Sequence, residues 1–166
     1  MAGPVRYVPA NGRFLSVALY DRSIAITMRE VAWRPRLVRE VLAGDPSDVL
    51  DLGCGTGTLA IAISRERDPT RVTGIDGDSE ILELARRKEG SERVELVEGL
   101  ADALPFADAS FDRVVASLLL HHLDPPTKRA ALAEARRVLR PGGRLHVACS
   151  TASRTPLTIQ RDGSPR

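Results

Sequence analysis

An apolar run, an acid and three alternating glycines in residues 49–57 form the part of this sequence that is most informative about chemistry. The apolar run predicts a buried strand, and Asp51 places a carboxylate near its end. A tight turn with nothing projecting into the space beside it is then expected from the glycines Gly53, Gly55 and Gly57. Apolar residues resume at helical spacing afterwards. Strand, turn and helix begin a βαβ unit, and ligands of such sheets bind beyond the carboxyl ends of the strands.

The spacing of the glycines distinguishes between ligands. Dinucleotide sites use Gly-x-Gly-x-x-Gly, and a carboxylate as close as Asp51 would repel a pyrophosphate. The segment instead resembles the first motif of class I S-adenosylmethionine-dependent methyltransferases, Asp-x-Gly-x-Gly-x-Gly. The resemblance implies that S-adenosylmethionine is the cofactor and that the loop, with Cys54 inside it, wraps the methionine portion. Asp51 then faces the methionine amino group.

A second apolar run, residues 71–75, ends in Asp76, which follows Asp51 by the length of one helix and one strand. An acid that ends the second strand of such a unit can accept hydrogen bonds from both ribose hydroxyls. The resemblance assigns that role to Asp76, with Gly77 beside it. Asp78 is better explained as a turn acid, since Asp78 and Ser79 are both good N-cap residues for the helix that begins after Ser79.

After a third run, residues 93–98, the sequence departs from the commonest pattern of the family. Many relatives carry an aspartate that accepts from the adenine amino group, and Leu100 stands at that position here. Ala101 keeps the backbone donor for the adenine ring, and Leu100 offers apolar contact to a purine face. Asp102 would supply the missing acceptor only if the loop shifts, and an exposed loop acid is an equally good explanation for it.

The fourth predicted strand, residues 111–117, continues into Leu118 and a Leu-His-His segment. This resembles the segment that follows strand four in the methyltransferases of ubiquinone and menaquinone rings and their relatives. Ser117 and Leu118 are expected to line the methionine end of the cofactor site. His121 and His122 are candidate bases for a proton lost during methyl transfer, because an imidazole titrates near neutrality. Packing and hydrogen bonding to backbone are the alternative explanation for each histidine.

Residues 13–43 show helical apolar periodicity, and the resemblance makes this segment a lid over the substrate. Tyr20 is a candidate for substrate contact, since a phenol both packs and hydrogen-bonds. Trp33 is expected to dock its helix on the sheet.

The last predicted elements are a helix that starts after Asp124, a stop at Pro141-Gly-Gly, and a fifth strand over residues 144–149. We expect Arg136 and Arg137 to be solvated at the end of that helix, where cations complement the dipole. Residues 151–166 form a polar tail, too short for the C-terminal hairpin that the family usually adds. Strand five should therefore be an exposed sheet edge, available for a homodimer.

Length and composition bear on the number of domains, the class of partner and the cellular compartment. A length of 166 residues suits one domain, residues 1–150, followed by the tail. A net charge of +2 with scattered arginines does not indicate nucleic acid. Two cysteines, Cys54 and Cys149, suggest free thiols in a reducing cytoplasm. No apolar stretch of about 18 residues predicts a membrane span, and we expect no metal site.

The resemblance, which covers roughly residues 13–149, implies an α/β fold, a Rossmann-like, doubly wound, mostly parallel sheet with strand order 3-2-1-4-5. The function implied by the resemblance is methyl transfer from S-adenosylmethionine to a small molecule, with the acceptor atom left open. A catalytically silent S-adenosylmethionine-binding protein, acting as an assembly or regulatory partner, is the alternative. Hydride transfer from a nicotinamide cofactor is disfavoured by the glycine spacing and by Asp51.

Overall fold

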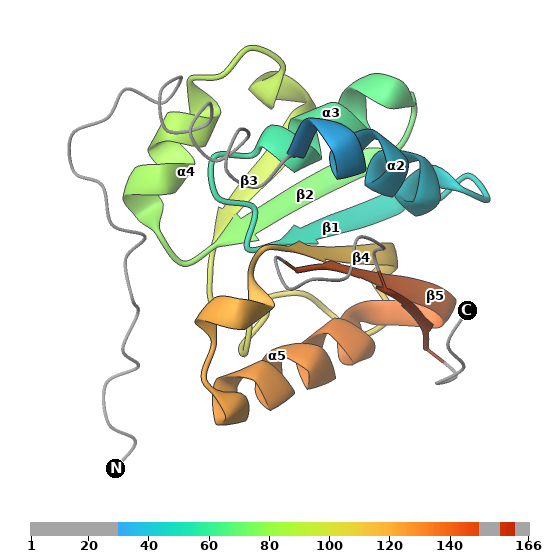
Figure 1. The fold of residues 1–166 in the computed structure, drawn as a ribbon, viewed down its shortest axis with the longest axis vertical. Coiled ribbons are helices and arrows are strands. Elements are labelled where there is room, and N and C mark those ends of the chain that lie inside the picture. Colours follow the sequence, from blue (N-terminus) through green and yellow to red (C-terminus); the bar gives the residue numbers. More distant parts are fainter. Residues whose placement is uncertain (1–29, 150–156, 162–166) are drawn as a thin grey trace.

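The computed structural model describes residues 30–149 and 157–161, and these form one sheet with helices on both faces (Figure 1). The order of the strands is β3-β2-β1-β4-β5-β6, with β1 to β5 parallel and β6 antiparallel to β5. The strand bounds are β1 Asp48–Leu52, β2 Arg71–Asp76, β3 Val94–Glu98, β4 Phe111–Ser117, β5 Leu139–Ala148 and β6 Leu157–Gln160. The predicted order 3-2-1-4-5 is confirmed.

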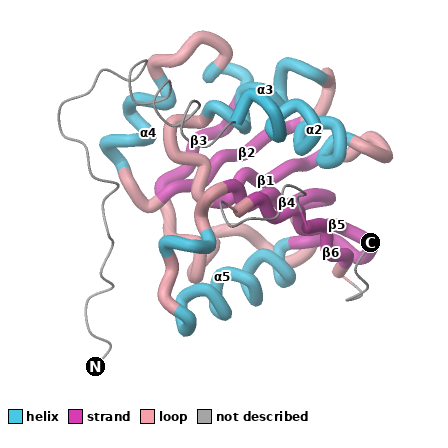
Figure 2. Tube along the Cα trace, in the orientation of Figure 1, coloured by secondary structure: helices cyan, strands magenta, loops and turns pink. Residues whose placement is uncertain are grey.

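Helices α2, α3 and α4 cover one face of the sheet, and α5 covers the other (Figures 1 and 2). Their bounds are α2 Glu30–Leu42, α3 Thr58–Glu66, α4 Ser79–Arg86 and α5 Pro125–Val138, and two short 3₁₀ turns are η1 Ser91–Arg93 and η2 Leu120–His122. Asp78 accepts from the backbone N–H groups of Glu80 and Ile81, and Asp124 accepts from that of Thr127. Asp124 is therefore the predicted N-cap of α5, and of the two candidates Asp78 and Ser79 it is Asp78 that caps α4.

Each face of the sheet has its own apolar cluster. Under α2 and α3 the cluster includes Leu37, Val41 and Ile63, with Trp33 packed against it as expected. Under α5 it includes Leu52, Ala135 and Val138, together with apolar side chains of the segment between β3 and β4. Burial on both faces explains why the central strands read as continuous apolar runs rather than as alternating ones.

The junction between α5 and β5 differs from the prediction. Helix α5 ends at Val138, and β5 begins at Leu139, ahead of the Pro-Gly-Gly segment that we expected to separate them. The pairing of β5 with β4 shifts register between Phe111 and Arg113, so the Pro-Gly-Gly segment is accommodated as an irregularity inside the strand. Gly142 has a φ of 77°, a conformation that favours glycine there.

The expected exposed edge at strand five was wrong. Residues 157–160 form β6, which pairs with β5 from Arg144 opposite Gln160 to Val147 opposite Leu157. The backbone of Arg161 donates to the carbonyl of Gly143 over 2.9 Å, and its guanidinium donates to the carbonyl of Leu139. The unpaired groups on which we based a homodimer through strand five are thus satisfied within the chain.

Removal of β6 should create the edge that the intact chain lacks. A chain that ends at residue 156 is expected to self-associate, because β5 then presents unpaired N–H and C=O groups. Light scattering across a dilution series measures this, with a chain ending at residue 161 as the matched control. Equal masses for the two chains at every concentration would contradict the prediction.

The predicted helical lid is described only in part. Helix α2, from Glu30 to Leu42, lies inside the predicted range of 13–43. Tyr20 lies outside the described residues. In the described part of the chain, no helix is long and apolar enough to cross a membrane.

Candidate functional site

The predicted glycine turn connects the carboxyl end of β1 to α3, and two of its N–H groups bind the neighbouring strand. The backbone N–H groups of Gly53 and Cys54 donate to the carbonyl of Ile75 over 2.8 and 3.0 Å. Gly53 has a φ of 72°, and Gly57, which precedes α3, has a φ of 70°. These left-handed conformations strain any side chain with a Cβ, which explains why glycine occupies them.

Gly53 and Gly55 differ in how much space surrounds them. A Cβ on Gly53 would lie 2.7 Å from the side chain of Leu119, so that glycine permits close packing of the segment after β4. A Cβ on Gly55 would meet no atom of the described residues within 4 Å. The turn is therefore closed on the side of β4 and open at its middle.

Asp51 is the most unusual side chain at this end of the sheet. It is 1% exposed, and neither carboxylate oxygen has a hydrogen-bond partner among the described residues. Burial, reinforced by the charge of Asp76, raises the pKa of Asp51 to about 7, against smaller opposing effects of the Ala60 backbone and the Arg34 guanidinium. A buried acid in this condition favours a cationic or hydrogen-bond-donating ligand.

Asp76 ends β2 beside the turn and is already hydrogen-bonded. Its Oδ2 accepts from the backbone N–H of Gly55 over 2.8 Å, and its Oδ1 accepts from that of Asp78 over 3.0 Å. Burial raises the pKa of Asp76, while the N–H groups of Gly55, Asp78 and Gly77 act in the opposite direction. Each carboxylate oxygen retains a further acceptor position, so Asp76 can hold the turn and still accept from a ligand.

The segment after β3 returns to the same edge. The backbone N–H of Gly99 donates to the carbonyl of Asp76 over 3.0 Å, and a Cβ on Gly99 would lie 2.8 Å from Ile75. Leu100 and Ala101 follow directly and are half-buried. The carbonyl of Leu100 accepts from the N–H of Ala103 over 3.2 Å, which closes a tight turn.

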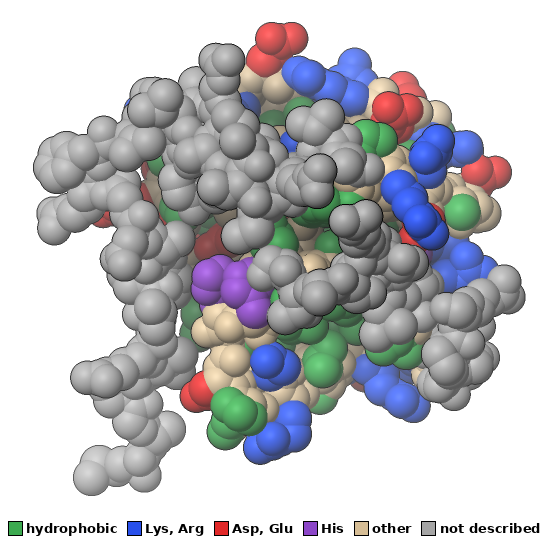
Figure 3. Space-filling view, viewed as in Figure 1, with side chains coloured by type: hydrophobic (Ala, Val, Ile, Leu, Met, Phe, Trp, Pro, Cys, Tyr) green, Lys and Arg blue, Asp and Glu red, His purple; other side chains and the backbone are tan. Residues whose placement is uncertain are grey.

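The end of β4 places the remaining candidates. Ser117 and Leu118 are half-buried, and the N–H of Leu118 donates to the carbonyl of Ala148 over 2.8 Å. Leu118 has a φ of 55°, a strained conformation for a leucine. His121 and His122 follow in η2, both exposed, with ring centroids 3.9 Å apart. Figure 3 shows their imidazoles as a purple patch on the surface.

The two histidines differ in their surroundings. His121 Nδ1 lies 3.7 Å from the Sγ of Cys149, at the end of β5. Burial, with the charges of His122 and Lys128, lowers the pKa of His121. The imidazole of His121 is therefore neutral at physiological pH and able to take up a proton.

The donor and acceptor set suits S-adenosylmethionine. Asp51 offers a buried, unpartnered carboxylate for an ammonium group, and the open space at Gly55 leaves room beside it. Asp76 offers acceptors for hydroxyls at the next strand end. By contrast, the described residues contain no group of three or more His, Cys, Asp or Glu side chains suited to a metal ion.

Cys54 contributes its backbone rather than its thiol. Its side chain is buried, and burial together with Asp51 and Asp76 raises the pKa of the thiol. A protonated, buried thiol is a poor nucleophile. Cys54 and Cys149 are both free cysteines, as predicted.

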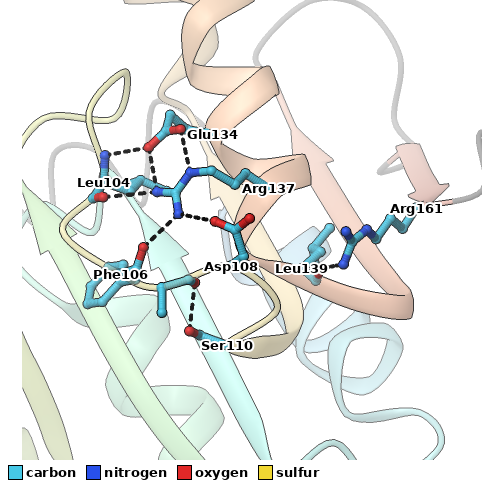
Figure 4. A network of polar contacts seen from close by, with 9 residues as sticks. Leu104, Phe106, Asp108, Ser110, Glu134, Arg137, Leu139 and Arg161 are labelled. Carbon is cyan, nitrogen blue, oxygen red and sulfur yellow. Dashed lines mark hydrogen bonds and ion pairs between the residues drawn. The ribbon is translucent and has the colours of Figure 1, made fainter.

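Sequence reasoning missed several residues that shape the site. Leu119 packs against Gly53, and Lys88 donates to the hydroxyls of Thr56 and Thr58, over 2.7 and 2.6 Å, at the start of α3. Arg137, expected to be solvated, instead contacts the segment between β3 and β4 (Figure 4). Only the Glu134-to-Arg137 spacing hinted at an ion pair, and nothing in it indicated the loop as a partner.

Comparisons with known proteins agree with this geometry. Demethylmenaquinone methyltransferase from Staphylococcus aureus is 39% identical over 144 residues, which cover 84% of this chain and 58% of that protein. The chain thus spans well under two thirds of the length of this relative.

Solved structures show the same fold. The YcgJ protein from Bacillus subtilis is 30% identical, with a TM-score of 0.61, over 70% of this chain and 50% of that one. A S-adenosylmethionine-dependent methyltransferase from Thermotoga maritima is 28% identical, with a TM-score of 0.60, over 79% of this chain and 56% of that one. A model of the methyltransferase domain family matches residues 49–143, which include the glycine turn, Asp76 and the end of β4. The chain therefore belongs to the methyltransferase domain family.

Proposed function

We propose that the chain binds S-adenosylmethionine and transfers its methyl group to a small-molecule acceptor. The observation that carries this proposal is the pair of acids at the ends of adjacent strands. Asp51 is buried without a partner among the described residues, and Asp76 accepts a hydrogen bond from Gly55 in the glycine turn. A ligand with an ammonium at one end and ribose hydroxyls further along would satisfy both. Family membership supports the same ligand.

The residues of the turn and of the neighbouring strand ends would hold the cofactor. Asp51 would accept from the methionine ammonium, and Asp76 with Gly77 would bind the ribose. Leu100 and Ala101 would contact the adenine, and the turn with the end of β4 would surround the methionine through Gly53, Cys54, Gly55, Gly57, Ser117 and Leu118. When bound, S-adenosylmethionine supplies an electrophilic methyl group on a sulfonium.

The chain's contribution to transfer is chiefly positioning and exclusion of water. Positive charge is lost from the sulfonium as the methyl group leaves, so no site for a developing anion is required. Where the acceptor carries a proton, the neutral imidazole of His121 can take it up, with the tilted ring of His122 beside it.

The name of the relative gives the first acceptor to test. Demethylmenaquinone methyltransferase is the printed name of proteins 39% identical to this chain. We therefore propose a hydroxylated aromatic ring, such as a reduced naphthoquinone, as the acceptor class. The free thiols of Cys54 and Cys149 support a reducing compartment, and we place the reaction in the cytoplasm.

Two measurements test the proposal in sequence. Isothermal titration with S-adenosylhomocysteine, the demethylated product, tests the cofactor, and absence of binding would overturn the assignment. Transfer of labelled methyl to a panel of reduced quinones, phenols and amines then tests catalysis. Binding without transfer to any acceptor would favour the catalytically silent alternative.

Replacing His121 with alanine tests the proposed base. We expect kcat to fall by roughly tenfold, less than is usual for a positioned base, because the ring is exposed and water can replace it. Since the pKa of His121 is lowered, the acidic limb of the wild-type pH profile should lie below the ordinary histidine pKa. His122→Ala is the matched control. An unchanged acidic limb in His121→Ala would contradict the role.

A further inference from the structure

The segment between β3 and β4, residues 99–110, contains turns but no helix or strand. It carries Leu100 and Ala101, which the proposed function places against the adenine. Because the segment belongs to no helix or strand, other contacts must hold it in place. At the β4 end, the N–H groups of Ala109 and Ser110 donate to the carbonyls of Arg137 and Val138 over 3.0 and 2.8 Å. The part nearer to the adenine needs a different support.

That support is the side chain of Arg137 in the last turn of α5 (Figure 4). Its Nη1 donates to the carbonyl of Phe106 over 2.7 Å and to Asp108 Oδ1 over 2.9 Å. Its Nη2 donates to the carbonyl of Leu104 over 3.0 Å and to Glu134 Oε2 over 2.7 Å. Its Nε donates to Glu134 Oε1 over 2.7 Å. Every N–H group of the guanidinium is therefore used.

Glu134 does more than balance this charge. Its Oε2 also accepts from the backbone N–H of Leu104 over 2.8 Å. The hydrogen bonds from Arg137 lower the pKa of Glu134, so the carboxylate stays ionised. Leu104 thus has both its N–H and its carbonyl bound by one Glu–Arg pair. The pair is partly shielded, with side-chain exposures of 30% for Arg137 and 21% for Glu134.

We propose that Glu134 and Arg137 are positioning residues for the adenine-binding segment and set the affinity for the cofactor without touching it. This rests on the proposed function. The pair acts on residues 104–108, which lie between the backbone anchors at 109–110 and the adenine-facing residues 100–101. Leu104 and Ala101 also pack in the same apolar cluster under α5, which links the held part of the segment to its adenine-facing end.

The role requires arginine. A planar guanidinium can reach two main-chain carbonyls and two carboxylates at once, whereas a lysine ammonium is a point charge with fewer donors. An ion pair of purely structural value would tolerate lysine. A loss of cofactor affinity in Arg137→Lys would therefore indicate that the pair positions the segment, whereas unchanged affinity would indicate simple charge pairing.

Binding of S-adenosylhomocysteine and of 5′-methylthioadenosine to Arg137→Met, Arg137→Lys and Glu134→Gln tests the proposal. Losing a typical net hydrogen-bond contribution from the segment corresponds to about tenfold weaker binding. We expect that loss for both ligands in Arg137→Met, since both carry adenine. Arg137→Lys should recover little of it, and Glu134→Gln should lose less. Arg65→Met is the matched control, because Arg65 also donates to a loop carbonyl, that of Glu89 over 2.7 Å.

Hydrogen exchange of the ligand-free variants supplies a readout independent of binding. Arg137→Met should raise exchange in residues 99–108 and leave β5 unchanged. Unaltered affinity and exchange in Arg137→Met, or full rescue by lysine, would overturn the proposal while leaving the cofactor assignment intact. Absence of wild-type binding would overturn the proposed function, and exchange would still report whether the pair orders the segment. If Arg137→Met does not fold, Glu134→Gln decides by the same two measurements.

Discussion

Replacing Asp76 with alanine is expected to weaken binding of S-adenosylhomocysteine by about 2–3 kcal/mol, or roughly 30- to 150-fold. Two effects add. The ribose hydroxyls lose a charged acceptor, and the N–H groups of Gly55 and Asp78 lose the carboxylate that now holds them at 2.8 and 3.0 Å. Isothermal titration at a fixed pH measures the loss.

Asp78→Ala provides the control for Asp76→Ala. It removes the N-cap of α4, which costs about 1 kcal/mol of stability, without removing a proposed ligand contact. Its affinity should remain close to that of the wild type. Similar affinities for Asp76→Ala and the wild type would remove Asp76 from the cofactor site.

The central part of the fold could be predicted because its signals are local. Strands buried on both faces appear as apolar runs, and the capping acids Asp78 and Asp124 stand directly before their helices. The interval between Asp51 and Asp76 matches one helix and one strand, so adjacency of the two strand ends followed from topology. The acids at the site were therefore accessible from the sequence.

Contacts that depend on tertiary partners were not accessible in the same way. Residues 157–160 are a short run in a polar segment, and only pairing with β5 makes them a strand. Arg137 binds mainly main-chain carbonyls, which leave no trace in residue type. The packing of Leu119 against Gly53 likewise depends on how the segment after β4 turns. Non-local pairing and main-chain acceptors account for these errors.

Replacing Asp51 with asparagine should stabilise the ligand-free protein at alkaline pH. The pKa of Asp51 is raised from 3.8 to about 7 in the folded state. At low pH the carboxyl is protonated in both folded and unfolded states and has no linked effect. As pH rises from about 4 to about 7, only the unfolded state ionises freely, so folding stability falls. Asp51→Asn removes this loss, on the order of 4 kcal/mol at pH 8.

Asp48 gives a control of opposite sign on the same strand. The hydrogen bonds of Arg71 and Arg140 outweigh burial and lower the pKa of Asp48. Its contribution to stability is present above the unfolded pKa and is lost as pH falls through the folded one. Denaturant unfolding from pH 4 to 8 should therefore show a smaller fall toward alkaline pH in Asp51→Asn, whereas Asp48→Asn should lose stability. An unchanged pH dependence in Asp51→Asn would contradict the raised pKa.

Asp51→Asn should stabilise the ligand-free protein but remove most of its affinity for the cofactor. An ammonium placed against a neutral amide lacks its counter-charge in a buried site, which costs about 3 kcal/mol, or roughly 150-fold in affinity. Because the ligand selects the ionised carboxylate, wild-type affinity should rise with pH through about 7, with proton release detectable in buffers of different ionisation enthalpy. This rise should be absent in Asp51→Asn. A pH-independent wild-type affinity would mean that the ligand's cationic group lies elsewhere.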